Sequence, residues 1–330
     1  MNLDDSKHEL YSLLADPPWD ENLLEKCYFY SFIETREFIQ SHHPGYIVYL
    51  ELESIRLSLD VFLNSVADLI ASINRFKGES AKPSFWHRPQ RQFVEELKIS
   101  IQRGVASSAM CAMTLVDHAR RFSKHHPIAE YDNKVSQYFK NSQEHIFVQN
   151  FRNYIAHFKL SPANWMSTSS IQEGRKVFFL LSQNDLLKFD RWKPLAKEYI
   201  CDNPDGVDVE QLFKQYSAKV AEFHNWIRSA VLETYGELIS GYLHYQRLLN
   251  CFDARSYWRL ILNQVVIPKR IDPYIHLDSY LTKQELVSVF SLPYRSKAQV
   301  DRIIELVDEY GACTEEIRDL VYRCFGVQES

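Results

Sequence analysis

The feature that most constrains this chain is a long run of apolar residues at helical spacing between Tyr46 and Phe76. Apolar residues recur there every three or four positions, at Ile47, Leu50, Ile55, Leu59, Phe62, Val66, Leu69 and Ile73. This period places them on one face of a single long α-helix. Similar patterns predict helices over 20–41, 90–123, 128–159 and 207–250, the last continuing to Val266 after a break near 251–253.

Glycine is scarce, at 9 of 330 residues, and folds made only of sheets need many turn glycines. One short region departs from the helical period. Residues Trp165–Ile171 and Lys176–Leu181 flank a four-residue loop and predict a β-hairpin. The sequence therefore predicts an all-α fold, a helical bundle with a small inserted β-hairpin near 164–182.

Two prolines, Pro268 and Pro273, mark the clearest linker in the chain. We expect N-terminal helices over 1–45, a helical bundle carrying the hairpin over 46–266, and a small C-terminal helical subdomain over 267–330. Beyond the linker, Thr282, Ser296 and Thr314 each stand where a side chain can cap a short helix.

Composition excludes several classes of function. The net charge of −5 argues against a protein that coats nucleic acid through charge alone, so RNA contact would need a local patch. The six cysteines are scattered without a C-x-x-C pair, which indicates free thiols rather than a zinc or redox site. The apolar runs are far shorter than the ~20 residues that span a bilayer. We expect a cytoplasmic chain with no membrane segment, metal or cofactor.

One constellation that could carry chemistry lies late in the predicted helix over 128–159. The stripe predicted to face the core consists of Val148, Phe151, Ile155 and Phe158. Asn153 and His157 are neighbours four residues apart, and they point almost directly away from that stripe. Arg152 lies on the flank, and its long side chain can reach them. The three side chains are therefore expected to gather on a face that the core does not need.

This combination suits cleavage of RNA. A neutral imidazole at His157 can take the proton from a ribose 2′-hydroxyl. The guanidinium of Arg152 can hold the phosphate and stabilise the charge of the transition state. Asn153 can orient the imidazole or donate to a phosphate oxygen. Because the nucleophile belongs to the substrate, the reaction needs no metal, cofactor or protein nucleophile, and the 2′-hydroxyl restricts it to RNA.

The segment Arg152-Asn153-x-x-x-His157 resembles the motif of the HEPN superfamily, an Arg followed after four to six residues by a His, often with a polar residue directly after the Arg. The resemblance covers residues 46–160, with the helix near 207–250 as a further bundle member. It implies a helical bundle, a homodimer in which two motifs meet, and metal-independent endoribonuclease activity in a toxin–antitoxin or antiviral defence setting. It also implies RNA as substrate and an antitoxin or regulatory partner.

The bare Arg-and-His spacing also occurs three more times, at Arg36/His42, Arg120/His125 and Arg270/His276. The first two pairs precede prolines at predicted helix ends, where basic side chains suit the carbonyl end of the helix dipole. The third pair spans Pro273 and cannot lie in one helix. The match at Arg152 is thus the one predicted to lie inside a helix.

Further basic residues are candidates for weak RNA contact: Arg88, Arg91, Arg120, Arg121 and Lys159. Those near Phe85 and Trp86 combine positive charge with aromatic rings, which suits single-stranded RNA through phosphate pairing and base stacking. The competing interpretation is a solvated helix face beside a buried tryptophan.

Two other functions stay open from the sequence. The helical bundle could be a non-catalytic scaffold or interaction protein with a degenerate HEPN fold. Alternatively, the short helices over 282–325 could read DNA as a helix-turn-helix, although acidic residues such as Glu305, Asp308 and Glu316 would repel phosphate.

Overall fold

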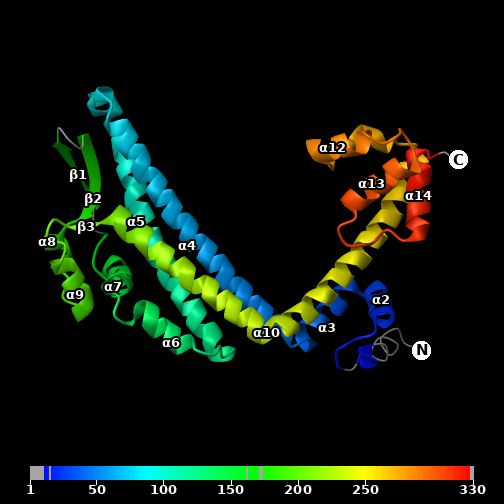
Figure 1. The fold of residues 1–330 in the computed structure, drawn as a ribbon, viewed down its shortest axis with the longest axis horizontal. Helices are drawn as coiled ribbons and strands as arrows, with labels where there is room; N and C mark the ends of the chain where they lie inside the picture. The colour runs from blue at the N-terminus through cyan, green and yellow to red at the C-terminus, as the bar shows by residue number, and fades with distance from the viewer. Residues whose placement is uncertain (1–10, 15, 161–162, 171–173, 328–330) are drawn as a thin grey trace. The chain divides into compact units, whose positions relative to one another are not determined.

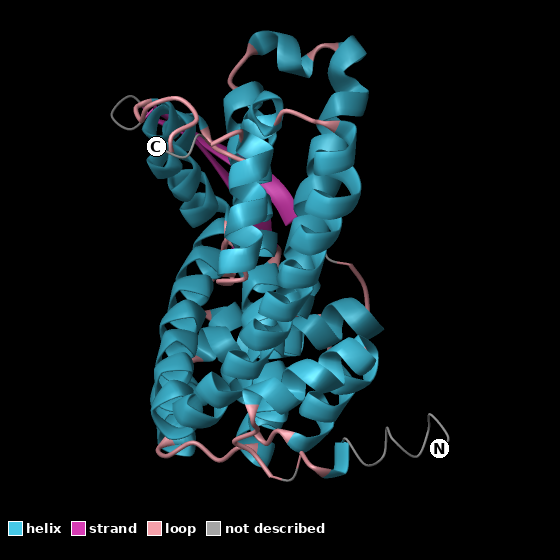
Figure 2. Ribbon diagram, turned by 90° about the vertical axis from the view of Figure 1, so that its right-hand side faces the viewer, coloured by secondary structure: helices cyan, strands magenta, loops and turns pink. Residues whose placement is uncertain are grey.

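The structure is a computed structural model that describes residues 11–14, 16–160, 163–170 and 174–327. Helices make up most of it, and the strands gather in one small sheet, as Figure 2 shows. The predicted all-α fold with a small inserted hairpin is confirmed. Contacts between Cα atoms divide the chain into two units, one formed by 1–46 with 237–330 and the other by 47–236.

The long helices α4 (Gly45–Ser80) and α5 (Arg91–His125) form an antiparallel pair in the unit of 47–236 (Figure 1). Ser58 Oγ lies 2.6 Å from His118 Nδ1, and Ser72 Oγ lies 3.1 Å from Ser100 Oγ. Five buried residues of α4 repeat every seven positions, at Val48, Ile55, Phe62, Leu69 and Phe76, and the buried Val66 and Ile73 lie between them on the same seam. A seven-residue repeat keeps a narrow apolar seam facing a partner helix over many turns.

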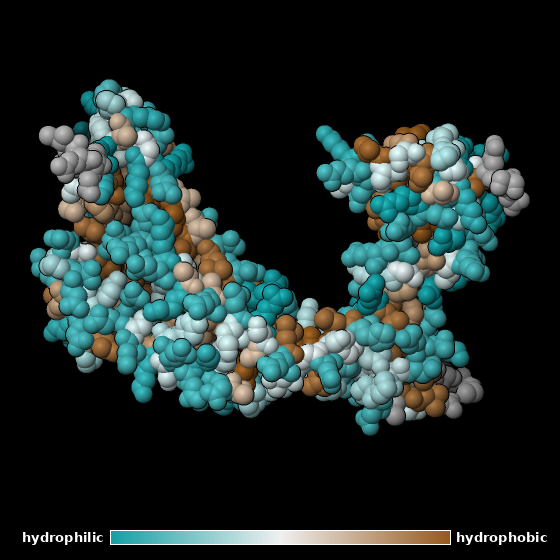
Figure 3. Space-filling model, in the orientation of Figure 1, coloured by the Kyte–Doolittle hydropathy of each residue, from teal (hydrophilic) through white to brown (hydrophobic). Residues whose placement is uncertain are grey.

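This repeat corrects part of the predicted core. Ile47 and Leu50 fit a period of 3.6 residues, but each is 48% exposed because both fall outside the seven-residue seam. Together with the exposed Leu57 and Val61 they leave an apolar stripe on the outside of α4. Figure 3 shows brown surface along this helix among the teal of polar side chains.

The rest of this unit consists of shorter elements and the first half of α10. They are η1 (Pro83–Trp86), η2 (Arg88–Gln90), α6 (Tyr131–Val135), η3 (Ser136–Lys140), α7 (Gln143–His157), α8 (Gln183–Leu186), α9 (Pro194–Cys201) and α10 (Val209–Ile261). The single helix predicted over 128–159 is therefore wrong. The backbone leaves the helix at Asn141, and Ser142 caps α7 by accepting a hydrogen bond from the His145 N–H at 3.3 Å.

The sheet is antiparallel in the order β1-β2-β3, with β1 (Ala163–Ser170), β2 (Gly174–Leu181) and β3 (Val207–Asp208). The two predicted hairpin strands are confirmed, Trp165 pairing with Phe179, while part of the predicted loop lies outside the described residues. Phe76 at the end of α4 packs against Trp165 and Phe179, with ring centroids 5.8 and 5.0 Å apart. Aromatic contacts thus attach the hairpin to the α4/α5 pair.

The other unit contains helices α2 and α3, the second half of α10 and the C-terminal helices. Its elements are α2 (Glu21–Tyr30), α3 (Phe32–His42), η4 (Leu262–Val266), α11 (Ile267–Lys269), η5 (Pro273–Ser279), α12 (Lys283–Phe290), α13 (Lys297–Val307) and α14 (Glu315–Phe325). The helix predicted over 20–41 is interrupted at Ser31, whose backbone is extended. The break predicted near 251–253 is absent, since α10 continues through these residues, and the Asp253 carboxylate accepts hydrogen bonds from Tyr28 and Arg36.

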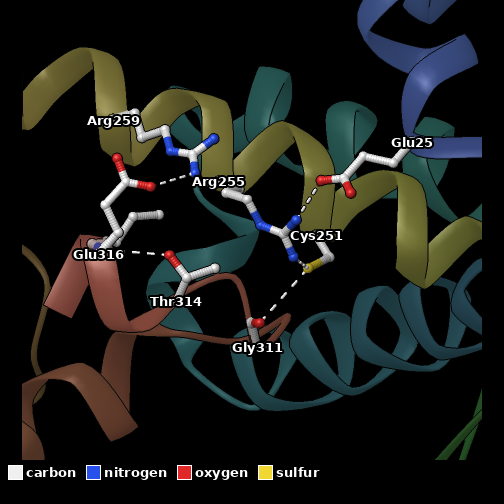
Figure 4. A network of polar contacts seen from close by, with 8 residues as sticks. Glu25, Cys251, Arg255, Arg259, Gly311, Thr314 and Glu316 are labelled. Carbon is white, nitrogen blue, oxygen red and sulfur yellow. Dashed lines mark hydrogen bonds and ion pairs between the residues drawn. The ribbon is translucent and has the colours of Figure 1, made fainter. Parts of the chain in front are cut away.

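Polar contacts tie α10 to both neighbours within this unit, as Figure 4 shows. Arg255 forms an ion pair with Glu25 of α2, and Arg259 Nη2 lies 2.7 Å from Glu316 Oε2 of α14. Cys251 Sγ lies 3.7 Å from the carbonyl oxygen of Gly311 in the turn before α14. Successive turns of one helix therefore hold the N-terminal and the C-terminal helices of the unit.

The three predicted N-caps of the C-terminal helices are confirmed. At α12, the Glu285 N–H donates to Thr282 Oγ1 at 3.4 Å and the Thr282 N–H donates to Glu285 Oε2 at 2.7 Å. Replacing Thr282 with alanine should lower the free energy of unfolding of this unit by about 1 kcal/mol, because the amide loses its acceptor. Urea titration of the variant checks this, and Thr282→Ser, which keeps the hydroxyl, should stay near the wild-type value.

Candidate functional site

Helix α7 carries the predicted motif, and its buried face is formed mainly by aromatic residues. Phe147, Val148, Phe151 and Tyr154 are buried where α7 packs against α5 and α9. Trp192 stacks on this face, with its ring centroid 5.5 Å from Phe147 and 5.6 Å from Tyr154. The Trp192 indole N–H also donates to the Leu186 carbonyl at 2.7 Å, which fixes the ring in place.

The predicted core stripe is right in its first half and wrong in its second. Val148 and Phe151 are buried, but Ile155 is half-buried and Phe158 is 46% exposed. Tyr154 occupies the core position instead, because the ring of Phe189 packs edge-on against it at 5.6 Å. The helix ends at His157, so Phe158 no longer follows the helical period.

The outer face of α7 presents the three candidate catalytic residues. Arg152, Asn153 and His157 are all exposed, whereas Phe147 and Phe151 of the same helix are buried. Arg152 Nη1 donates to Asn153 Oδ1 at 3.2 Å. Within the described part of the chain, Arg152 has no carboxylate within ion-pair distance. The guanidinium is therefore accessible to an external anion.

Lys159 lies close after the motif and is held by a carboxylate. Its Nζ is 3.2 Å from Asp185 Oδ1, which also accepts from Lys188 Nζ at 2.8 Å. The hydrogen bonds from Lys188 and Lys159 lower the pKa of Asp185. Lys159 is thus partly neutralised within the chain, which weakens it as a phosphate ligand.

The other basic candidates do not form one patch. Arg88 and Arg91 are exposed at the N-terminal end of α5, whereas Arg120 and Arg121 lie roughly 40 Å away along the same helix. Arg120 Nη1 is 3.9 Å from Asp117 Oδ1, and Arg121 Nη2 is 3.5 Å from a Glu51 carboxylate oxygen. The competing interpretation of a solvated helix face fits these positions better than a continuous RNA groove. The buried tryptophan of that interpretation is wrong, because Trp86 is 45% exposed and Phe85 is buried instead. The Trp86 indole N–H donates to the Ser80 carbonyl at 3.1 Å.

The histidines of two alternative pairs lie at helix ends, as predicted, and the third pair is divided by the end of a helix. Helix α3 ends at His42, whose Nδ1 is 2.9 Å from the Phe38 carbonyl oxygen, and Arg36 pairs with Asp253. Helix α5 ends at His125, which contacts Glu51. Arg270 has a positive φ of 50° at the end of α11 and so does not share a helix with His276. The expectation that only Arg152/His157 lies inside one helix is wrong, because Arg36/His42 and Arg120/His125 also lie within single helices that end at the histidine. The pairs differ in that Arg36 and Arg120 each have a carboxylate within ion-pair distance.

The sequence interpretation missed a second group of buried polar residues. These residues are His145 of α7 with Tyr216 and His224 of α10, and they form part of the lining of a small cavity of about 150 Å³. A signal was present, because His145 lies three residues before Val148 and therefore on the buried face of the helix. A histidine at a core position indicates a polar partner across the core, and here the partner is Tyr216.

Comparisons with known proteins give no family for this chain. No protein-family model matches it, and neither a search of curated proteins nor a search of solved structures returns a significant match. Among the described residues, no cluster of three or more His, Cys, Asp or Glu side chains is arranged to hold a metal ion.

One helix of the described chain, α4, is long and apolar enough to cross a membrane by length and composition alone. Its most apolar window has a mean hydropathy of 1.3 and is 22% buried. A single helix of this kind is weak evidence for a membrane segment, because core helices of soluble proteins pass the same test. In α4 the buried seam accounts for only part of the apolar character, because exposed residues such as Leu57 and Val61 contribute to it as well.

Proposed function

We propose that this chain is a metal-independent endoribonuclease that acts as a homodimer through Arg152, Asn153 and His157, in the cytoplasm. The observation that carries the proposal is that these three side chains are all exposed in the C-terminal half of α7. Arg152 has its hydrogen bond to Asn153 and no competing carboxylate among the described residues. From the HEPN resemblance we extend the proposal to a toxin or phage-defence role, with an antitoxin or regulatory partner.

The proposed reaction is an internal transfer within the RNA. His157 removes the proton from the 2′-hydroxyl, and the 2′-oxygen attacks the adjacent phosphorus as the bond to the 5′-oxygen breaks. The leaving oxygen takes a proton from the imidazolium of the second copy, so the products are a 2′,3′-cyclic phosphate and a 5′-hydroxyl. Arg152 neutralises charge on the phosphoryl oxygens, and Asn153 holds the guanidinium or donates to the phosphate.

One observation favours a non-catalytic role instead. Arg120, Arg121 and Lys159 each lie within ion-pair distance of a carboxylate of the same chain. A chain that binds RNA strongly would leave such side chains available to phosphates. The alternative is therefore a helical scaffold or interaction protein in which Arg152 and His157 have no catalytic role.

Substitution of Arg152 distinguishes the proposed nuclease from the alternative scaffold protein. We expect Arg152→Ala to abolish cleavage of a 5′-labelled single-stranded RNA, and Arg152→Lys to restore only part of it, because an ammonium cannot hold the phosphate bidentately. Lys159→Ala serves as the matched control and should retain most of the activity, since Lys159 is paired with Asp185.

The substrate supplies the second control. An RNA with a single 2′-deoxy residue before the cut bond should resist cleavage, because it lacks the nucleophile. The proposal fails if wild-type protein at micromolar concentration leaves RNA intact, or if it cuts the deoxy substrate equally well.

A further inference from the structure

A small cavity, partly open to solvent, lies in the unit of 47–236 between α5, α6, α7 and α10. Its volume is about 150 Å³, and its walls are largely apolar, including Leu115, Phe139, Val220 and Phe223. It lies at the N-terminal end of α7, whereas Arg152 and His157 lie in the C-terminal half. The cavity is therefore separate from the proposed catalytic face.

The first polar feature of the cavity is a chain of hydrogen bonds from Gln149 through His145 to Tyr216. Gln149 Nε2 lies 3.0 Å from His145 Nε2, and His145 Nδ1 lies 3.0 Å from the Tyr216 hydroxyl oxygen. If the Gln149 amide donates to Nε2, then Nδ1 carries the proton and donates to Tyr216. The phenol hydrogen of Tyr216 then has no acceptor within the described part of the chain.

His224 provides the second polar group. The residue is 6% exposed, and its Nδ1 has no hydrogen-bond partner among the described residues. A buried polar atom left without a partner costs about 1–3 kcal/mol, so such an atom beside a cavity indicates an occupant that satisfies it. Tyr216 and His224 lie eight residues apart on α10, roughly 12 Å along the helix axis.

Charge and size limit what can occupy this space. Burial lowers the pKa of both His145 and His224 to about 4, so both imidazoles are neutral at neutral pH. Two neutral imidazoles and a phenol suit a neutral ligand better than an anion. A cavity of about 150 Å³ can accept a molecule the size of benzene. Water would fill it poorly, because each molecule needs two to four polar partners and most of the wall is apolar.

We infer that this cavity is a binding site for a small neutral compound of one planar ring, with a hydrogen-bond acceptor at one end and a donor at the other. The acceptor receives the Tyr216 hydroxyl, and the other end pairs with His224 Nδ1. Arg120 and Asp132, which are exposed, lie at the cavity rim and carry opposite charges, so the rim has no net charge.

Thermal unfolding of the full chain with three probes tests the site. The probes are 4-pyridone, which carries a carbonyl and an N–H at opposite ends of its ring, phenol with one polar group, and benzene with none. We expect 4-pyridone to raise the melting temperature most and benzene least. It should also shift the side-chain nitrogen resonances of His224 and His145 in protein labelled with ¹⁵N-histidine.

Two variants separate binding in the cavity from binding elsewhere. His224→Leu replaces the unpartnered nitrogen with an apolar group and should weaken 4-pyridone about tenfold while benzene binds at least as well. Ala112→Leu fills the cavity and should remove binding of all three probes. His157→Ala should change none of these results, so the outcome does not depend on the proposed nuclease activity.

Three outcomes would overturn the inference. They are equal effects of 4-pyridone and benzene on the wild type, unchanged binding of 4-pyridone in Ala112→Leu, and histidine resonances that do not respond to saturating probe. Because His224→Leu removes an unpaired polar atom, it is expected to fold even if Ala112→Leu does not.

Discussion

Purified protein carrying His157→Ala should cleave RNA at least about 100-fold more slowly than the wild type. On the proposed mechanism the imidazole takes the proton from the 2′-hydroxyl in one copy and protonates the leaving oxygen from the other. Removal of both functions in one substitution leaves only the phosphate contact of Arg152. Initial rates on a labelled RNA, with product ends identified by mass spectrometry, measure the effect.

The fold should not change in this variant. His157 is exposed in the last turn of α7, and its side chain is absent from the aromatic face formed by Phe147, Phe151 and Tyr154. Helical circular dichroism and the urea midpoint should therefore match the wild type. His244→Ala changes an exposed histidine of the other unit and serves as the control for histidine loss. A His157→Ala protein that keeps half of the wild-type rate would rule out the catalytic assignment.

Acidification from pH 6.5 to pH 4 should destabilise the unit of 47–236 by about 3 kcal/mol for each of two buried histidines. Burial lowers the pKa of His145 and His224 to about 4, and Arg120 and Lys219 add repulsion at His145. Both pKa values lie below the ordinary 6.5, so the unfolded chain binds more protons across this window. The stabilisation is complete above pH 6.5, falls as the pH drops, and levels off below about 4. Urea titrations at half-unit pH steps measure it.

Removing one titrating group tests the origin of the slope. His224→Leu should abolish about half of the pH dependence between 6.5 and 4 and leave the part that belongs to His145. A variant whose stability falls with pH as steeply as that of the wild type would show that other groups, such as the carboxylates, cause the loss.

Much of the helical fold could be predicted because its signals are local. Three such signals depend only on neighbouring residues: the apolar repeat of α4, the alternation in the two hairpin strands, and the caps Thr282, Ser296 and Thr314. The predictions were wrong where contacts between distant elements determine which residues are buried. Ile47 and Leu50 have the right period for a lone helix, but a paired helix buries a narrower seam.

The candidate site was predictable only in part, for a similar reason. Exposure of Arg152, Asn153 and His157 follows from helical geometry, since the opposite face of α7 is apolar. The ion pair of Lys159 with Asp185 and the contact of Arg121 with Glu51 join residues far apart in sequence, so no local pattern reports them. The cavity beside His145 likewise needs α10, which follows some seventy residues later.

The division into units has a consequence for how the protein is made. The unit of 47–236 is continuous in the chain, whereas the other combines 1–46 with 237–330. Trp19 packs against Tyr245, and Glu25 pairs with Arg255, so the first segment leaves the ribosome well before the residues that stabilise it. The inserted unit can complete its own core during translation. The N-terminal helices cannot bury their apolar faces until the second half of α10 has been synthesised. Until then, these faces are accessible to chaperones.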